Sequence, residues 1–376
     1  MYRALVKEVG RKPLLGLLVF VPAGFVASKL RPEAHTLLFV LSVLAIVPLA
    51  VLLSQATHAV AAKTGDAAGG LLNATLGNLT ELVIALTALR AGDHLLVKAS
   101  IAGAIVTNTL FMLGMSLLLG GLKHHVQQFN RASARLQAAL LFLGTVALLI
   151  PSFARDGGSP AAATYVQTLS LALAILLIAA YGLGMLFSLG THRELFASEE
   201  HVAGEAPWPM ALALGTLVGV TVLVALVAEI FVESVQSAAV GFGMTPAFVG
   251  FVIVALVGGA AEMASAFSGA RQNRLDLSIG IALGSASQIA LFVAPALVLI
   301  SYVIAPSPMD LQLWPGAVAM MLIATLSAFI VANGGRSAWF IGVLVLNVYL
   351  VFATALYLLP PASVSAEPSA ISHRQK

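Results

Sequence analysis

Cysteine is absent from the 376-residue chain, and charged residues make up only 9% of it. The first absence excludes disulfides, thiolate metal ligands and cysteine nucleophiles. The second argues against a soluble domain, because about a quarter of the residues in such domains are charged. The few basic residues form no clustered face, so we expect no nucleic-acid partner.

Hydrophobic residues make up 60% of the chain, and several apolar runs reach the roughly 18–20 residues that cross a bilayer. We therefore predict an all-α polytopic membrane protein without a cleavable signal peptide. The expected spans number eleven, the first being short enough to lie at the interface instead. They are 14–28, 36–62, 67–90, 95–120, 137–154, 163–190, 208–238, 246–270, 276–304, 313–333 and 338–359.

An acidic loop divides these spans into a 1 + 5 + 5 arrangement. We expect an N-terminal segment with the first helix (1–35), a first five-helix repeat (36–190), an acidic cytoplasmic loop (191–207), a second five-helix repeat (208–359) and a polar tail (360–376).

The distribution of basic residues favours a cytoplasmic N-terminus, because Lys and Arg gather on that side of a membrane. With this orientation, twelve of the 19 Lys and Arg residues are cytoplasmic. They are Arg3, Lys7, Arg11, Lys12, Lys63, Lys123, Arg131, Arg135, Arg193, Arg271, Arg274 and Arg336.

The two five-helix halves repeat with an offset of 181 residues. Gly77, Glu81, Arg90 and Gly103 then correspond to Gly258, Glu262, Arg271 and Gly284. The matching helices are five spans apart, so they cross the membrane in opposite directions. This is an inverted-topology repeat, the architecture of many secondary transporters, in which the site lies where the halves meet.

Four glutamates fall inside apolar spans: Glu81, Glu229, Glu233 and Glu262. In continuous helices, Glu81 lies ~21 Å from Ala67 and Glu262 ~24 Å from Pro246, so both are inside the hydrocarbon. The other two share one face near the far interface, where a structural or entrance-lining role is expected.

A lone carboxylate at such depth costs roughly 2.5–3.5 kcal/mol on insertion scales. A protonated structural glutamate, a proton relay, or two carboxylates facing one divalent cation each offset that cost. The matched positions of Glu81 and Glu262 favour the third interpretation, because two independent structural glutamates have no reason to match.

Residues near the two glutamates offer further oxygen ligands. Glycines next to them allow close backbone approach or unwinding, and the following helix of each half carries polar side chains. A hydroxyl in a membrane helix often bonds its own backbone instead, so the amides are the stronger candidates. The candidate ligands beside the two glutamates are Gly77, Asn78, Thr107, Asn108, Gly258, Ser285, Ser287 and Gln288. Carboxylate and amide oxygens without cysteine or histidine suit Ca²⁺ better than zinc.

The sequences "GNLTEL" (77–82), "GGAAEM" (258–263) and "LDLSIGIALGSASQIALFVAP" (275–295) resemble the calcium/cation:proton antiporter family, within the cation/calcium exchanger superfamily. The resemblance extends from about residue 36 to residue 359. It implies that Glu81 and Glu262 are the central calcium ligands, with Asn78, backbone oxygens and Gln288 nearby. Two positions depart from the family pattern: Gly259 replaces an asparagine, and Met263 replaces a histidine.

The resemblance implies that Ca²⁺ leaves the cytosol in exchange for protons. Two neighbouring carboxylates without a cation should hold protons, which Ca²⁺ then displaces. We therefore expect a transporter rather than an enzyme, without a required cofactor, with Ca²⁺ and H⁺ as substrates. We expect it in the lipid bilayer of a prokaryotic inner (cell) membrane, and leave a homo-oligomer open.

Two alternatives on the same scaffold are a sodium/calcium exchanger and a monovalent cation:proton antiporter, which Thr107, Ser285 and Ser287 keep open. An intramembrane protease is disfavoured because H-E-x-x-H is absent. A passive channel is disfavoured by the inverted repeat.

Overall fold

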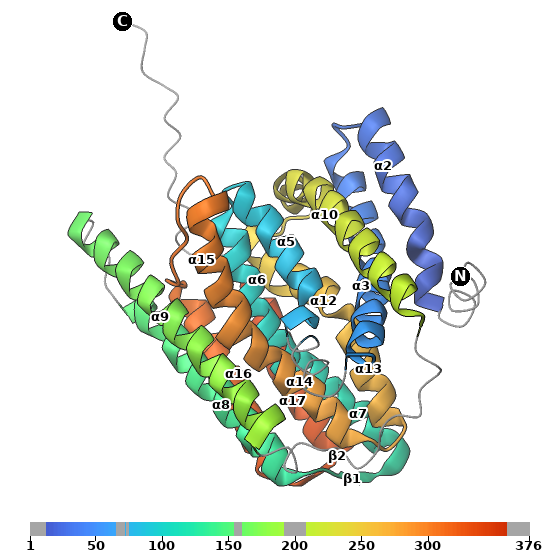
Figure 1. The fold of residues 1–376 in the computed structure, drawn as a ribbon, viewed down its shortest axis with the longest axis vertical. Helices are drawn as coiled ribbons and strands as arrows, with labels where there is room; N and C mark the ends of the chain where they lie inside the picture. Colours follow the sequence, from blue (N-terminus) through green and yellow to red (C-terminus); the bar gives the residue numbers. More distant parts are fainter. Residues whose placement is uncertain (1–12, 65–71, 73–74, 154–159, 192–207, 359–376) are drawn as a thin grey trace, which may run out of the picture.

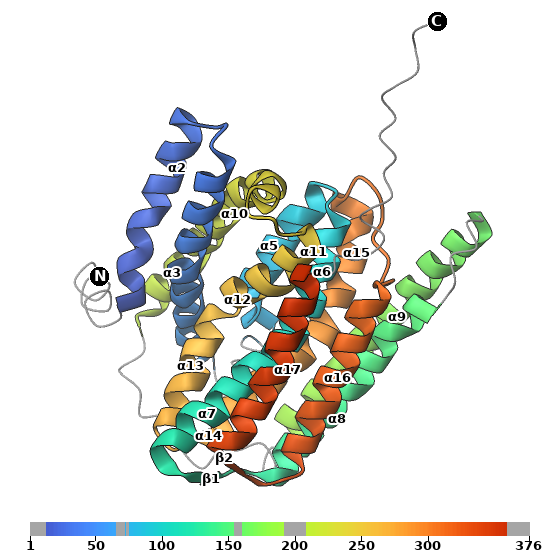
Figure 2. The same ribbon diagram turned by 180° about the vertical axis from the view of Figure 1, so that it is seen from behind.

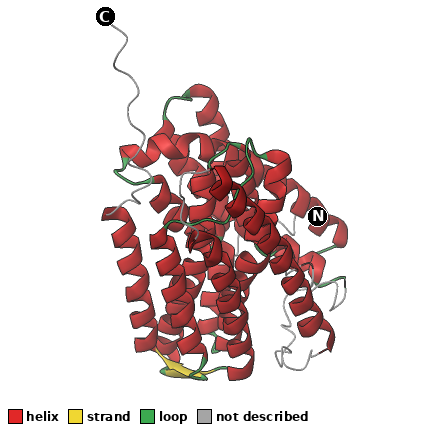
Figure 3. Ribbon diagram, turned by 90° about the vertical axis from the view of Figure 1, so that its left-hand side faces the viewer, coloured by secondary structure: helices red, strands yellow, loops and turns green. Residues whose placement is uncertain are grey.

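The computed structural model describes residues 13–64, 72, 75–153, 160–191 and 208–358 of the chain. Within these residues the protein is helical apart from short loops and one small two-stranded ribbon, as Figure 3 shows. The acidic loop and the polar tail predicted from the sequence lie outside the described residues, except for Thr191.

The first half begins with a 3₁₀ segment, η1 (Pro13–Val19), and continues through helices that cross the molecule in turn (Figure 1). These are α2 (Phe20–Leu30), α3 (His35–Ala61), α5 (Leu79–Arg90), the continuous rod α6 (His94–Val106), η2 (Thr107–Met112) and α7 (Leu113–His124), then α8 (Arg131–Leu149) with η3 (Ile150–Phe153), and α9 (Pro160–Leu186) with η4 (Phe187–Thr191).

The second half has the matching series of helices (Figure 2). These are α10 (Met210–Gly241), the group α11 (Pro246–Phe248), η6 (Val249–Val254), α12 (Ala255–Gly258) and α13 (Ala260–Arg271), the rod α14 (Leu275–Gln288), η7 (Ile289–Val293) and α15 (Ala294–Ile304), then α16 (Pro315–Ala332) and α17 (Trp339–Leu358).

The prediction of an all-helical polytopic membrane protein is confirmed, whereas the number of eleven spans is not. Eight described helices are long and apolar enough to cross a bilayer, and one bent pair brings the number to nine. The helix at Leu14–Leu30 is shorter, in keeping with the short first span that the sequence indicates. Of the expected span 67–90, only residue 72 and residues 75–90 are described.

The assumption of continuous helices around the two central glutamates is wrong. Residues Pro246–Arg271 form two helices that meet at Gly259 and are bent by 59°. In the first half, α5 begins only at Leu79, after a turn at Gly77 and Asn78. Straight-helix depths therefore do not apply to Glu81 and Glu262.

The two rods α6–η2–α7 and α14–η7–α15 lie at the centre of the molecule, and their side chains are mostly buried. Each contains a π-helical segment, and the segment at residues 107–112 corresponds under the 181-residue offset to residues 288–293, close to η7. A π segment changes which side chains face a neighbouring helix, and such segments recur at functional sites. Both rods are thus altered at equivalent heights, next to the glutamate helices.

A two-stranded antiparallel ribbon joins the halves at the end of the molecule where α13 ends (Figure 1). Its strands are β1 (Val126–Gln128) and β2 (Arg336–Ala338), with Val126 opposite Ala338. The side chain of Gln127 donates from Nε2 to Ala270 O at 2.9 Å, near the last turn of α13. The first half therefore caps the helix that carries Glu262.

Candidate functional site

The helices that carry the two central glutamates each begin at a break in the backbone. Asn78 precedes α5 with φ −97° and ψ 29°, and Gly259 precedes α13 with φ −78° and ψ 6°. These residues are equivalent under the 181-residue offset, and each lies three positions before its glutamate. Gly258 and Gly259 favour the break in the second half because glycine is a poor helix former.

Glu81 and Glu262 both lie in the first turn of their helices. The N-terminus of a helix carries unpaired N–H groups and a partial positive charge, so a carboxylate is stabilised there. Broken helices whose ends face a central site are a recurring feature of transporters built from inverted repeats. The breaks therefore reduce the cost of placing two acids inside an apolar molecule.

The Glu81 side chain packs against Gly258, next to the helix break of the other half. A Cβ built on Gly258 would lie 2.8 Å from Glu81 Cγ and 3.4 Å from its Oε1, so no larger residue fits without displacement. Glu262 lies four residues after Gly258, and the two carboxylates repel each other when both are charged. Both glutamates are half-buried, and together they form an acid pair contributed by both halves.

A hydrogen-bonded network links Glu262 to residues of both halves. Ser285 is its centre: its Oγ lies 2.8 Å from Glu262 Oε2 and 2.7 Å from Asn78 Oδ1. Asn108 donates from Nδ2 to Ser285 Oγ at 2.9 Å, and Asn78 donates from Nδ2 to Gln288 Oε1 at 2.7 Å. Five of the sequence-predicted residues thus meet within one connected group.

Other predicted side chains have different partners. Thr107 Oγ1 is 3.4 Å from the hydroxyl of Tyr349 on α17, which is not part of the network. Ser287 donates to Leu283 O at 2.7 Å within its own helix, as hydroxyls in membrane helices commonly do. Glu229 and Glu233 are exposed, and Glu229 Oε1 lies 4.0 Å from Arg90 Nη1. These four residues lie apart from the network.

The two departures from the resembled family pattern face the network from the second half. A Cβ on Gly259 would lie 3.3 Å from Met263 Cε and 3.6 Å from Asn108 Oδ1. Asn108, on the first half, therefore presents its amide oxygen beside the position where the second half lacks an amide of its own. Met263 is 6% exposed and packs into the same place.

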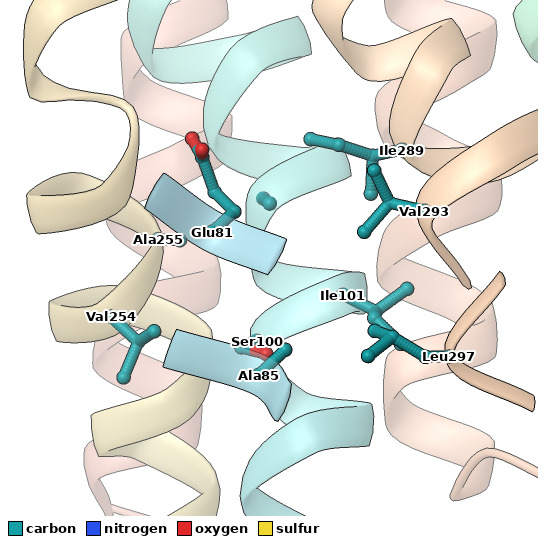
Figure 4. A pocket seen from close by; sticks show the side chains of 10 residues that line it. Glu81, Ala85, Ser100, Ile101, Val254, Ala255, Ile289, Val293 and Leu297 are labelled. Carbon is teal, nitrogen blue, oxygen red and sulfur yellow. The ribbon is translucent and has the colours of Figure 1, made fainter. Parts of the chain in front are cut away.

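The other side of Glu81 borders a small pocket with an almost wholly apolar lining (Figure 4). The figure shows the carboxylate of Glu81 pointing away from Ser100 and Ala85, which line the far part of this pocket. The pocket is lined by Glu81, Ala85, Ser100, Ile101, Ala104, Val254, Ala255, Ile289, Val293 and Leu297. The acid pair thus has an apolar neighbourhood at Glu81 and a polar one at Glu262.

Within the described part of the chain, no group of three or more His, Cys, Asp and Glu side chains could hold a metal ion. A cation between Glu81 and Glu262 would therefore be bound by two carboxylates together with neutral oxygens of amides, hydroxyls and backbone. Such oxygen ligands are the ones that hard cations such as Ca²⁺ prefer. The arrangement suits a cation that neutralises the acid pair.

One further pair of equivalent residues was not predicted from the sequence. Under the same offset Gln55 on α3 corresponds to Gln236 on α10, each 22 residues before the glycine at the helix break. Gln236 donates from Nε2 to Asp93 Oδ2 at 3.2 Å, next to the end of α5. Extending the offset upstream of Gly77 would have found this pair.

Comparison with known proteins finds matches along most of the chain. A model of the family "sodium/calcium exchanger protein" matches residues 34–190 and again residues 212–358. The Ca(2+)/H(+) antiporter of Synechocystis sp. is 38% identical over 366 residues, which cover 93% of this chain and 98% of that protein. The Ca(2+)/H(+) antiporter ChaA of Bacillus subtilis is 36% identical over 349 residues, with 91% and 98% covered.

Solved structures agree with these matches. The structure of native YfkE superposes with a TM-score of 0.78 at 33% identity and covers 91% of this chain and 100% of that one. The H⁺/Ca²⁺ exchanger CAX superposes with a TM-score of 0.71, covering 94% and 89% of the two chains. At 16% identity, the second likeness concerns the fold alone.

Proposed function

The chain belongs to the sodium/calcium exchanger protein family, and we propose from this premise that it exchanges Ca²⁺ for H⁺ across a membrane. Relatives named as Ca²⁺/H⁺ antiporters are 36–38% identical to it and match more than nine tenths of its length. The resemblance to calcium/cation:proton antiporters that the sequence motifs indicate is thereby confirmed. The transported Ca²⁺ is the substrate of this protein rather than a resident cofactor.

The observation that carries the proposal is the acid pair at the two helix breaks. Glu81 and Glu262 come from opposite halves, stand at equivalent positions and repel each other when both are charged. Bound Ca²⁺ cancels both charges, and protons do the same when the cation is absent. Because one set of oxygens serves both ions, binding of one excludes the other.

The network around Ser285 gives each residue a role in this exchange. Glu81 and Glu262 bind Ca²⁺ or protons alternately. Asn78, Asn108, Ser285 and Gln288 supply or orient neutral oxygens, and Gly77 and Gly258 allow the backbones to approach. Thr107 has only a supporting place beside the site, because its hydroxyl is directed to Tyr349.

Sodium-driven calcium exchange on the same scaffold is the main alternative. Sodium-driven members of the superfamily generally present more hydroxyl and carboxylate ligands around the central pair. In this sequence, three hydroxyls keep that interpretation open, those of Thr107, Ser285 and Ser287. Of these, only Ser285 contacts the acid pair or the amides, whereas Thr107 and Ser287 bond elsewhere. This distribution supports protons as the counter-ion.

The test is transport by the purified protein in proteoliposomes. An imposed pH gradient should drive ⁴⁵Ca²⁺ uptake, and a Na⁺ gradient at constant pH should not. Uptake driven by Na⁺ at constant pH would replace the proposal with sodium/calcium exchange. Uptake of ⁴⁵Ca²⁺ that depends on neither the pH gradient nor the Na⁺ gradient would indicate a passive channel.

The proposal includes an orientation in a prokaryotic inner membrane with the N-terminus in the cytoplasm. The bias of Lys and Arg supports it, since Lys123, Arg131, Arg271, Arg274 and Arg336 all lie at the end of the molecule that carries the ribbon. A reporter fused after Leu358 should then be protected from cytoplasmic reagents. Labelling of that reporter from the cytoplasm would contradict this orientation.

A further inference from the structure

Polar contacts tie α10 to the corner between α5 and α6. We call the end of the molecule at this corner the Arg90 face, and the opposite end, where α13 ends, the Arg271 face. Gln236 on α10 donates from Nε2 to Asp93 Oδ2 at 3.2 Å. Asp93 also accepts from Leu96 N at 3.0 Å and so caps α6, while Glu229 lies 4.0 Å from Arg90. Side chains of both halves therefore meet at the Arg90 face.

The equivalent contact at the Arg271 face is absent from this conformation. Gln55, the counterpart of Gln236, lies on α3, and the counterpart of Asp93 is Arg274 in the turn between α13 and α14. Both side-chain polar atoms of Gln55 are buried, and neither has a hydrogen-bond partner. Among the described residues, Arg274 forms no ion pair and is half-buried.

A buried amide without partners is costly, at about 1–3 kcal/mol for each unsatisfied group. Native proteins satisfy nearly all such groups, so each exception calls for a physical reason. The reason here follows from the internal symmetry. If the halves exchange their arrangements, Gln55 acquires the environment that Gln236 has now, with Arg274 in the place of Asp93.

The chemistry of the two pairs fits this exchange. At the Arg90 face the amide nitrogen of Gln236 donates to a carboxylate, whereas at the Arg271 face the amide oxygen of Gln55 can accept from a guanidinium. Arginine has donors only, so it suits the oxygen of glutamine as aspartate suits its nitrogen. The charged partner therefore differs between the two faces, but at each face a glutamine amide can form a hydrogen bond with it.

We propose that Gln236 and Gln55 are positioning residues that close opposite faces of the protein in turn. In this structure Gln236 ties α10 to Asp93 and closes the Arg90 face. In the opposite state Gln55 ties α3 to Arg274 and closes the Arg271 face. Because α3 and α10 pack against each other along their lengths (Figure 1), they move together, so that closing one face opens the other.

This inference rests on the proposed exchange, since alternating access is what antiport requires. Its test is nevertheless independent of the transported ions. The chain has no cysteine, so introduced pairs are the only thiols. One double variant combines Asp93→Cys with Gln236→Cys, and the other combines Gln55→Cys with Arg274→Cys. A short bifunctional methanethiosulfonate joins each pair, and a protease site inserted within residues 192–207 lets a gel detect halves that remain joined.

We expect each pair to cross-link, and each cross-link to stop transport until reductant is added. In the variant with all four cysteines, mass spectrometry should find at most one cross-link in any molecule. Molecules carrying both cross-links, or no cross-link between positions 55 and 274 in folded protein, would overturn the proposal. If the cross-links exclude each other while Ca²⁺/H⁺ exchange is not found, only the assignment of the ions is wrong.

A second measurement covers the case in which the cysteine variants fail to fold. Gln55→Leu removes the unsatisfied amide and should favour the present conformation, raising the cross-linking yield at positions 93 and 236 and slowing transport several-fold. Gln137→Leu is the matched control, because Gln137 on α8 also has a buried unpartnered oxygen but lies outside both pairs. Equal effects of the two leucine variants would reduce Gln55 to a packing residue.

Discussion

The hydroxyl oxygen of Ser285 on α14 lies 2.7 Å from the amide oxygen of Asn78, at the start of α5. This contact joins the two halves of the chain at the site itself, because Asn78 comes from the first half and Ser285 from the second. The same hydroxyl lies 2.8 Å from Glu262 and accepts a hydrogen bond from Asn108. The position of one carboxylate of the acid pair is therefore set by residues that are far apart in the sequence.

Replacing either central glutamate should abolish exchange. Glu81→Gln and Glu262→Gln each leave one carboxylate to neutralise a divalent cation, and loss of one partner from a buried charged group costs roughly 3–5 kcal/mol. We expect pH-driven ⁴⁵Ca²⁺ uptake to fall by about 100-fold or more. Glu233→Gln is the control, because Glu233 is exposed on α10 and should retain activity. Normal uptake by both central variants would end the two-glutamate model.

The apparent affinity for Ca²⁺ should depend on pH with a definite sign. Protons occupy the same carboxylates as Ca²⁺, so lowering the pH on the side of binding leaves fewer sites free and raises the apparent KM. The rise should be about 10-fold per pH unit if one proton is displaced and about 100-fold if two are displaced. The change of KM with pH is obtained from initial rates of ⁴⁵Ca²⁺ uptake, measured while the pH is varied on the side of binding and held constant on the opposite side. A KM that stays constant with pH would show that protons bind elsewhere.

Two serines that lie two residues apart on α14 should respond differently to mutation. Ser285→Ala removes the hydroxyl that links Glu262 and the two asparagines, at a cost of about 1–2 kcal/mol, so the KM for Ca²⁺ should rise about 10-fold. Ser287→Ala removes a hydroxyl that bonds Leu283 O in its own helix and should change KM by less than about 2-fold. Equal KM values for the two variants would remove Ser285 from the site.

The lack of a side chain at Gly258 should be required for the position of Glu81. Gly258→Ala places a Cβ 2.8 Å from Glu81 Cγ, and overpacking of this kind costs about 1–3 kcal/mol. We expect a lower Tm in detergent and strongly reduced ⁴⁵Ca²⁺ uptake. Gly280→Ala is the matched control, because a Cβ there meets nothing within 4 Å. Undiminished uptake with Gly258→Ala would mean that Glu81 is free to lie elsewhere.

The sequence predicted the fold class and the residues of the acid pair because these depend on local and repeated signals. Long apolar runs require helices in a bilayer, where the backbone must satisfy its own hydrogen bonds. Glu81 and Glu262 stand out because charge is rare in such runs and because they match under one offset. The glycines before them allowed close backbone approach or unwinding, but the depths were calculated for straight helices and the bend at Gly259 invalidates them.

The partners of the polar side chains were not predictable in this way. Ser285 and Ser287 are chemically identical and two residues apart, yet one joins the network and the other bonds its own helix. Thr107 and Asn108 are adjacent in η2, and they face Tyr349 and Ser285 respectively. Which way each points depends on the π segments and on the packing of helices distant in the sequence.

By itself, then, the amino-acid sequence determined that the chain spans a membrane as a repeated helical unit and that two glutamates lie within it. Only the tertiary structure decided which amides and hydroxyls surround those glutamates and which glutamine has a partner. The reason is that hydrophobicity and repetition are properties of single segments. A hydrogen bond between halves exists only once both segments are folded and packed together.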